Sequence, residues 1–533
     1  MYMKISEKDI SRIEHSKRNA TTALVSSILM GLFSFAERTV FNQYFLADYL
    51  GLYSFFNNVI NILITAELGI TQSIAFALYA PLEYRNSDQI KAIMLFFKKA
   101  YIIIGSVILA AGLLFMPFMH LLLKTSVPME KVYIYYLTFL VTTVINYYLT
   151  YKNVIFVASQ NQYKITLVSN ILWSILYLSQ ILIAIFTQNF LFYCIAISVA
   201  NIFKDILLRI FANRDFPILK EHYKVKLENS IKHTIKRNIK GLVMTKLGSI
   251  MVSTTDSILI SALVSTAFLG IYSNYQMITA GLYNIICILP SAVTASIGNI
   301  AVSESKEKVY RSFIKLDLGS YFIYSTICII LINIADPIIS TFFGSNKVMP
   351  FVSLSLVILN FYIISLREIL YSYKNSLGLY WYDRKRPIIE GITNLLTSII
   401  LGHYFGFNGI ILGTIITNII VNLIMEPKII YHEGFEKSSL SYYYTQGGRI
   451  LLTIGVSAIS LFINRQIKIP EIGNLSLLGI KFNLNGIITI IIYALIAIIT
   501  TIILYIIVFY KNKDAREILE VIKITIKRKR ISK

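Results

Sequence analysis

The sequence predicts an all-α polytopic membrane protein with about 14 transmembrane helices, built as two pseudo-symmetric six-helix lobes followed by two C-terminal helices. Three observations predict this fold class. Apolar residues make up 56% of the 533 residues and charged residues only 15%, which is more apolar than a soluble core needs. Windows of about 20 apolar residues, enough to cross ~30 Å of hydrocarbon as a helix, can be drawn fourteen times. An internal repeat relates the earlier windows to the later ones.

These windows fix the expected order of elements along the chain. The expected spans are 20–46, 49–78, 100–123, 132–158, 165–187, 190–212, 240–264, 268–300, 316–342, 349–377, 388–404, 408–426, 450–464 and 486–510. The expected regions are a cytoplasmic segment 1–19, an N-lobe 20–212, a basic cytoplasmic linker 213–239, a C-lobe 240–430, two further helices in 431–510 and a basic cytoplasmic tail 511–533.

The repeat has an offset of 219 residues without a gap. Leu50–Ser54 (LGLYS) recurs as Leu269–Ser273 (LGIYS), and the Lys-Arg-Asn run at 17–19 recurs at 236–238. Many transporters are built from two similar halves, because alternating access requires two elements that move about a central site. The repeat therefore makes transport the leading hypothesis.

The distribution of Lys and Arg predicts the orientation in the membrane. With the amino terminus inside, 37 of the 50 basic residues fall on the cytoplasmic side and only six fall in outer loops. Basic residues are retained on the cytoplasmic side of short loops. We therefore expect a multi-pass protein of the bacterial plasma membrane with both termini in the cytoplasm. The net charge of +22 then belongs to membrane edges and does not indicate nucleic-acid binding.

The sequence lacks the motifs of several kinds of chemistry. The three cysteines lie far apart in apolar spans, and the six histidines show no HExxH spacing, so we expect no metal site. No Gly-Lys dipeptide occurs, so a Walker A nucleotide site is excluded. The polar loops are short, which disfavours an enzyme. No cofactor is expected, although coupling to a proton or sodium gradient is compatible with the sequence.

Charged residues inside the spans are the candidate functional groups. A charge in the middle of a helix costs ~2.5 to 3.5 kcal/mol on insertion scales, so such residues usually face a cavity or a partner. Arg38, Lys246 and Arg367 are candidates for a cationic cavity that binds an anionic group such as a diphosphate. The alternative is internal ion pairing that holds helices together.

Two further lysines belong to a second trace of the duplication. The tripeptide Tyr-Lys-Asn occurs at Tyr151–Asn153 and again at Tyr373–Asn375. Lys152 and Lys374 are therefore matched, and both lie near inner helix ends. They are candidates for the same cationic cavity, and snorkelling toward the interface is the alternative explanation.

Four intramembrane acids are candidates for ion coupling or for gating pairs: Glu37, Glu67, Asp256 and Glu368. The 219-residue offset places Glu37 opposite Asp256, so an acid of the first apolar segment recurs in the second half. Such groups could titrate or coordinate a coupling ion. Structural pairing with a base is the alternative.

Three segments resemble a known family. They are YLGLYSFFNNVINILITAELGITQSIAFALYAPL from Tyr49, SNYQMITAGLYN from Ser273 and GLYWYDRKRPIIEGITNLLTSIILGHYFGFNGIILGT from Gly378. They are similar to the Wzx-type polysaccharide repeat-unit flippases of the MOP superfamily, which also holds lipid II flippases and MATE exporters. The resemblance extends over about residues 15–510 and implies a twelve-helix, two-lobed core with two added helices.

The resemblance also implies a cargo and partners. The implied cargo is an undecaprenyl-diphosphate-linked oligosaccharide, moved from the inner to the outer leaflet for capsule, exopolysaccharide or O-antigen-like synthesis. A polysaccharide polymerase and the chain-length machinery are candidate protein partners. Four alternatives stay open: a lipid II or other envelope-precursor flippase, a MATE-like small-molecule exporter, a membrane-embedded glycan polymerase or ligase, and a passive scaffold.

Overall fold

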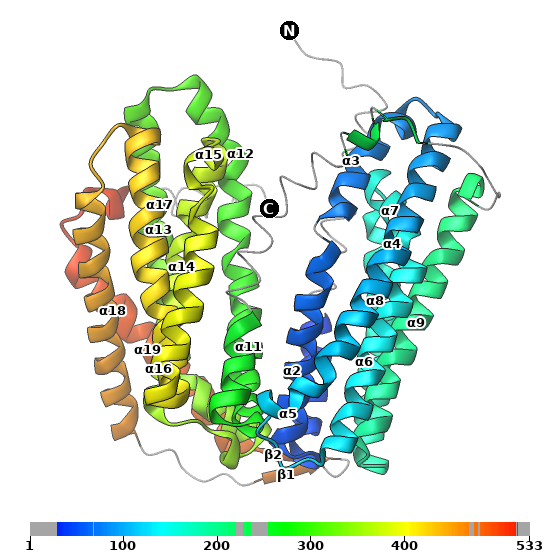
Figure 1. The fold of residues 1–533 in the computed structure, drawn as a ribbon. Helices are drawn as coiled ribbons and strands as arrows, with labels where there is room; N and C mark the ends of the chain where they lie inside the picture. Colours follow the sequence, from blue (N-terminus) through cyan, green and yellow to red (C-terminus); the bar gives the residue numbers. More distant parts are fainter. Residues whose placement is uncertain are drawn as a thin grey trace, which may run out of the picture. The chain divides into compact units, whose positions relative to one another are not determined.

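The computed structural model describes residues 29–67, 69–219, 254–467 and 480–518, together with the short pieces 227–229, 231–233, 235, 474–477 and 520. Most of these residues are helical. The chain divides into two compact units, Met1–Gly270 and Ile271–Lys533, each of which contains a bundle of long helices (Figure 1). Lys246 and most of the expected basic linker and tail lie outside the described residues.

The first unit begins with a helix at 29–44. The elements that follow are α2 (Ala47–Ile64), η1 (Thr65–Glu67), α3 (Ile70–Glu83), α4 (Ser87–Phe115), η2 (Met116–Phe118), α5 (Met119–Leu122), α6 (Met129–Thr150), η3 (Tyr151–Asn153), α7 (Val154–Ala158), α8 (Gln162–Phe186), α9 (Phe190–Asp215) and η4 (Pro217–Leu219). Helix α6 packs on α4 and α9, and α8 packs on α9. A helix at 254–259 continues into η5 (Ile260–Val264) and is followed by the start of α11 (Thr266–Ile286).

The second unit contains the rest of α11 and the remaining elements. They are α12 (Ile288–Ser303), α13 (Lys306–Ile338), η6 (Ile339–Phe343), η7 (Ser345–Lys347), α14 (Phe351–Ser376), α15 (Tyr380–Asp383), α16 (Arg386–Thr417), η8 (Asn418–Asn422), α17 (Leu423–Ile429), η9 (Ile430–Phe435), α18 (Leu440–Gln466), β1 (Asn474–Leu477), β2 (Ile480–Asn483) and α19 (Leu484–Phe509). Helix α13 packs on α14, α18 and α19. The two short strands pair antiparallel.

The predicted fold class is confirmed. Nine helical segments in the described residues are long and apolar enough to cross a membrane. One of them, Tyr380–Phe435, holds two of the expected spans, because the backbone turns at Gly406 (φ 56°, ψ −133°) and starts a second helix. The expected spans 49–78 and 268–300 are each interrupted, as α2 and α3 and as α11 and α12. These interruptions were not predicted.

Helix α19 shows why a membrane environment is required. Its most apolar window is only 11% buried inside the protein, while its mean hydropathy is 2.9. Ile503, Ile506 and Ile507 each expose more than half of their surface. Apolar side chains on the outside of a helix bundle face lipid, where they need no protein partner. The chain is therefore a multi-pass membrane protein.

Two helices of the second unit approach closely through glycines. The turn at Gly406 folds the second half of α16 back onto the first, and Gly409 and Gly413 lie one turn apart on the returning helix. A Cβ on Gly409 would overlap the carbonyl of Leu401, and one on Gly413 would lie 2.6 Å from the backbone nitrogen of Ser398. Small residues with this spacing allow helix backbones to pack together in membranes.

This contact predicts a difference between two identical substitutions. Gly413→Ala should destabilise the protein by about 1–3 kcal/mol, since the added methyl group meets backbone that cannot move away. Gly455→Ala on α18 has nothing within 4 Å and should be neutral or stabilising, because alanine favours a helix. Thermal unfolding in detergent measures both. Equal melting temperatures for the two variants would contradict the close packing.

Exposed ion pairs lie at the predicted inner end of the second unit. Lys306 Nζ donates to Glu436 Oε1 at 2.5 Å, and Lys315 Nζ lies 2.5 Å from Glu517 Oε2. The hydrogen bonds from these lysines lower the pKa of both carboxyls below the ordinary value of 4.5. Their stabilising effect is therefore present at neutral pH and lost as the pH falls through the folded-state pKa. Solvent exposure keeps the effect small.

Candidate functional site

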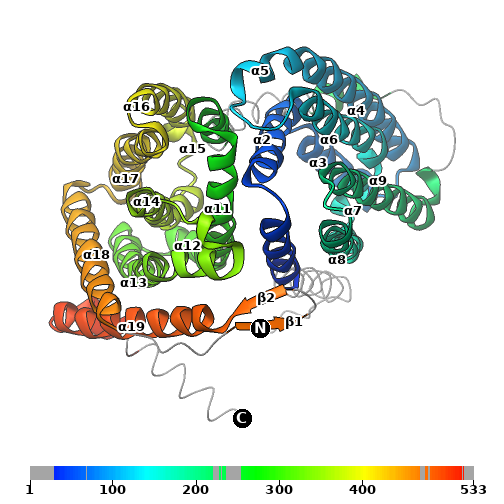
Figure 2. The ribbon, with the colours of Figure 1, turned by 90° about the horizontal axis from the view of Figure 1, so that it is seen from below.

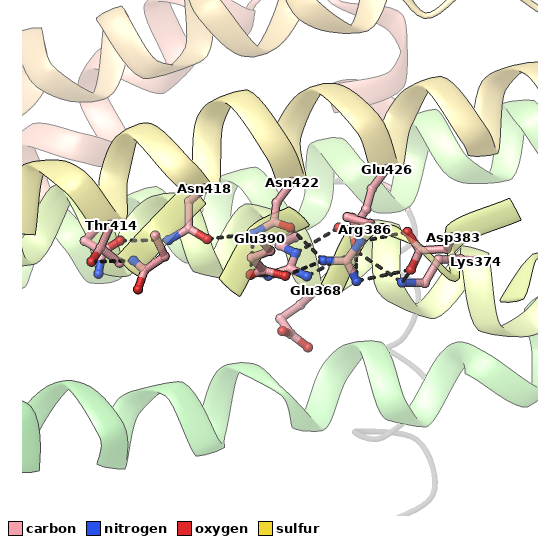
Figure 3. A network of polar contacts seen from close by, with 12 residues as sticks. Glu368, Lys374, Asp383, Arg386, Glu390, Thr414, Asn418, Asn422 and Glu426 are labelled. Atoms are coloured by element: carbon pink, nitrogen blue, oxygen red, sulfur yellow. Dashed lines mark hydrogen bonds and ion pairs between the residues drawn. The ribbon is translucent and has the colours of Figure 1, made fainter. Parts of the chain in front are cut away.

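A buried network of charged side chains occupies the predicted inner half of the second unit (Figure 3). Three bases and three acids meet there from α14, α15, α16 and α17: Arg367, Lys374, Asp383, Arg386, Glu390 and Glu426. Their formal charges cancel. We call these six residues the charge network.

Glu426 is the centre of the charge network, and its side chain is fully buried. Arg367 donates from Nε to Glu426 Oε2 at 2.9 Å and from Nη2 to Oε1 at 3.2 Å, a two-pronged contact. Lys374 Nζ donates to Oε1 at 3.1 Å, and Arg386 Nη2 lies 3.2 Å from the same oxygen. A carboxylate with three cationic partners is held in its charged form.

The other two acids of the charge network, Asp383 and Glu390, neutralise the remaining positive charge. Asp383 accepts from Lys374 at 2.6 Å and from Arg386 Nε at 2.7 Å. Glu390 accepts from Arg386 Nη1 at 2.6 Å and from Arg367 Nη1 at 3.2 Å. Buried ions are tolerated when each is paired and hydrogen-bonded. The network therefore joins four helical elements of one unit.

A row of amides continues from the charge network toward the middle of the unit (Figure 3). Asn422 accepts from Arg386 Nη1 at 2.7 Å and donates to Glu390 Oε1 at 2.7 Å and to Asn418 Oδ1 at 2.8 Å. Asn418 in turn donates to Asn360 at 3.1 Å. Polar side chains thus extend along η8 between charged groups and the apolar part of the bundle.

The predicted bases lie in different surroundings. Arg367 and Lys374 belong to the charge network. Lys152 in the first unit is buried, and its Nζ donates to Asn213 Oδ1 and, at 3.0 Å, to the carbonyl of Leu219. Arg38 is half-buried on the helix at 29–44. Binding of an anion by these bases stays a prediction.

Two of the predicted acids, Glu37 and Glu368, contact hydroxyl groups. Glu37 is buried and accepts a hydrogen bond from Tyr193 Oη at 2.6 Å. Glu368 on α14 accepts from Tyr283 of α11, and its carboxylate points away from the charge network (Figure 3). Asp256 lies half-buried in the described helix at 254–259. A functional pairing of Glu37 with Asp256 stays a prediction.

Glu67 lies where helix two is interrupted. The chain leaves the α-helical conformation after Ile64 and resumes it at Ile70, with Gly69 at φ 79°. The Glu67 carboxylate accepts from Thr71 of α3, and from Tyr101 of α4 and Tyr147 of α6 at 3.4 Å each. Three elements thus donate to one acid at a helix break.

The second unit repeats this interruption. α11 ends at Ile286 and α12 begins at Ile288. The 219-residue offset of the sequence repeat matches Glu67 with Ile286, so both breaks occur at equivalent positions. In the first unit the acid lies on the interrupted helix, whereas in the second the phenol of Tyr283 lies there and the acid, Glu368, lies on α14. Interrupted helices are typical of binding sites in transporters.

Sequence reasoning missed four members of the charge network: Asp383, Arg386, Glu390 and Glu426. Each lies near the inner end of a predicted span, where a charge needs no explanation. It also missed three acids inside the spans: Asp205 in 190–212, and Asp317 and Asp336 in 316–342. An acid within an apolar span is the same signal that identified Glu67, so the rule could have found them.

Comparisons with known proteins agree on the fold. No protein-family model and no curated protein sequence matches the chain. Among solved structures, an inward-facing MATE family multidrug resistance transporter of the MOP superfamily matches with a TM-score of 0.60 and 13% identity, covering 76% of this chain and 96% of that one. The lipid II flippase MurJ in an inward closed conformation matches with a TM-score of 0.59 and 17% identity, covering 91% of this chain and 98% of that one. The protein has the fold of these all-α MOP-superfamily structures.

Proposed function

We propose that the protein is a flippase that moves an undecaprenyl-diphosphate-linked oligosaccharide repeat unit across the bacterial cytoplasmic membrane by alternating access. The proposal rests on how much of this chain each similar structure covers. The lipid II flippase covers 91% of this chain, whereas the MATE transporter covers 76%. A flippase for a lipid-linked precursor is therefore favoured over a small-molecule exporter. An oligosaccharide cargo, with a role in capsule or related polysaccharide synthesis, rests on the Wzx-like sequence segments.

The added helices are an integral part of the second unit. Asp317 of α13 accepts from Arg449 Nη1 and, at 3.0 Å, from Gln446 Nε2, both on α18. Near the other end of α18, Asn464 Nδ2 donates to Asn333 Oδ1 at 2.6 Å. All five side chains are buried. Polar contacts of this kind fix one helix against another in a membrane, so α18 is held at both ends.

Exposure separates the bases that a diphosphate could reach from those that it could not. Within the charge network, the side chain of Arg367 is 19% exposed, whereas those of Lys374 and Arg386 are 3% and 5% exposed. Arg38 is also half-buried, and Lys152 is buried. We assign anion binding to Arg38 and Arg367, and a structural role to Lys152 and Lys374.

Leaflet translocation in proteoliposomes tests the proposal. The cargo is a fluorescent lipid-diphosphate oligosaccharide whose outer-leaflet fraction is read by quenching. The parent should flip it, and Arg38→Ala should lower the rate about tenfold or more, since a charge-assisted hydrogen bond to phosphate contributes ~1.5–3 kcal/mol. Arg38→Lys should retain part of the rate.

A matched control separates anion binding from folding. Lys152→Met removes a base of the same unit that lies away from solvent, so it should change stability more than the translocation rate per folded molecule. Failure of the parent to flip this cargo or lipid II, while it exports small cations, would replace the flippase assignment by an exporter. Chemical consumption of the lipid-linked substrate would indicate a polymerase or ligase.

A further inference from the structure

An open cavity lies in the second unit where α13 ends and α19 begins, at the predicted outer end. Its volume is about 450 Å³, within the range of ~300–1,000 Å³ that is usual for ligand sites. Its lining includes Asp336, Pro337, Ser340, Asn485, Thr489 and Tyr493. Figure 2 shows α19 beside α13. We call this space the outer cavity.

Helix irregularity forms one wall of the outer cavity. Pro337 lies inside α13 and has no backbone N–H to donate, so the regular helix cannot continue unchanged. The chain widens into the π-helix η6 and ends at Gly344, with φ 108°. Such π segments are rare and often occur at functional sites.

The start of α19 forms the second wall and packs against this irregular turn. Asn483 caps α19, and its Oδ1 accepts from the backbone nitrogen of Gly486 at 3.0 Å. A Cβ on Gly486 would overlap the side chain of Thr341, so glycine permits the close approach. The cavity is therefore bounded by two helix ends that are fixed to each other.

Asp336 is held in a defined orientation. Tyr275 of α11 donates from Oη to Asp336 Oδ1 at 2.6 Å. The same phenol oxygen accepts from the backbone nitrogen of Met349 at 3.2 Å. The carboxylate is thus positioned from outside the cavity that it lines.

Several oxygens of the lining can accept hydrogen bonds, and the amides of Asn483 and Asn485 add donors. Ser340 Oγ donates to the carbonyl of Pro337 at 3.1 Å, and Thr489 Oγ1 donates to the carbonyl of Asn485 at 2.7 Å. Both hydroxyls use their single hydrogen in this way and keep lone pairs for a ligand. With the carboxylate of Asp336, these oxygens match a ligand that carries several O–H donors.

The charge and size of the outer cavity narrow the ligand class. Its lining includes one carboxylate and no Lys, Arg or His, which disfavours phosphates and other anions. A single carboxylate and about 450 Å³ are a poor match for one metal ion, and the described residues hold no group of three His, Cys, Asp or Glu that could bind one. Pro337 and the ring of Tyr493 supply apolar surface for the C–H face of a sugar ring.

We propose that the outer cavity binds a neutral or amino sugar unit through Asp336, Ser340 and Thr489. Carbohydrate binding follows from the lining alone. Its use as a subsite for the glycan of the cargo rests on the proposed function.

Saturation-transfer NMR tests the binding, because it detects weak ligands of a large particle. The parent in lipid nanodiscs is exposed to neutral hexoses, N-acetylhexosamines, hexosamines and one uronic acid. We expect signal for at least one neutral or amino sugar and much weaker signal for the uronic acid. Asp336→Asn with Thr489→Val should weaken binding about tenfold, the effect of losing about one net hydrogen bond.

The variants are chosen to keep the fold. An asparagine at 336 retains an oxygen that can accept from Tyr275, and valine matches the shape of threonine. Asn346→Ala is the matched control, since Asn346 is exposed in η7 at the same end of the unit but does not line the outer cavity. It should bind like the parent.

Three results would overturn the site: no signal with any sugar in the panel, unchanged binding by the double variant, or preferred binding of the uronic acid. The test also separates the two proposals. A parent that binds sugar in the outer cavity but flips no lipid-linked oligosaccharide would retain this site and remove the cargo. A parent that flips the cargo without any sugar signal would remove this site alone.

Discussion

Glu426→Gln should destabilise the second unit by about 3–5 kcal/mol, the usual consequence of leaving buried charge without its partner. Glutamine keeps the shape of the side chain but removes the negative charge that Arg367, Lys374 and Arg386 share. The charge network then carries a net positive charge in a buried place. Unfolding of the purified protein in detergent, by heat or by denaturant, measures the loss of stability.

Two further variants make this prediction specific. Glu433→Gln changes an acid on the neighbouring turn that pairs with exposed His432, and it should have little effect. Glu426→Gln combined with Lys374→Met removes one charge of each sign and should recover part of the lost stability. If Glu426→Gln alone is as stable as the parent, the charge network does not hold these helices together.

The fold class could be predicted because its causes are local in sequence. A span is apolar along its whole length, and a duplication leaves repeated residues at a constant offset. Most of the expected spans therefore contain helix where the structure describes them. The interruptions could not be predicted in the same way, since spans 49–78 and 268–300 stay largely apolar through the break. Pro290 follows the second break, but no proline lies near the first.

The candidate site was predictable in part. Arg367 and Lys374 could be identified as charges inside a span. Their partners could not, because Asp383, Glu390 and Glu426 come from three other elements and meet only when the helices pack. A single charge in a span predicts that a partner or a cavity exists. The sequence does not say whether a partner or a cavity is present. In the charge network, helix packing supplies three acids as partners for three bases.

The acids inside the membrane spans fall into two groups with different chemical capacities. Glu426 contacts bases, which stabilise only its charged form. Glu67 contacts the hydroxyls of Thr71, Tyr101 and Tyr147 in the described part of the first unit. A hydroxyl both donates and accepts, so it can bond a charged carboxylate or a protonated carboxyl. Acids of the second group can exchange a proton without losing their partners.

Glu67→Gln should therefore abolish the acceleration of translocation by a pH gradient while leaving slow, gradient-independent flipping. Glutamine can still bond the three hydroxyls, so the helix interruption should persist, but it cannot take up a proton. If Glu67 couples a proton to the transport cycle, the variant should lose a stimulation of about fivefold or more, the lower end of usual coupling free energies. The measurement is the flipping rate in proteoliposomes with and without an imposed pH gradient.

Glu304→Gln is the control, since Glu304 is an exposed acid that pairs with Lys308 at a helix start. It should respond to the gradient like the parent. A Glu67→Gln protein that is still accelerated by the pH gradient would assign the coupling elsewhere, and Glu368→Gln and Glu37→Gln would be the next variants to compare. A parent that responds to sodium and not to protons would instead make Glu67 a structural partner of the helix break. Glu67 would then differ from Glu426 in its hydrogen bonds but not in its role, because it would not change its charge during transport.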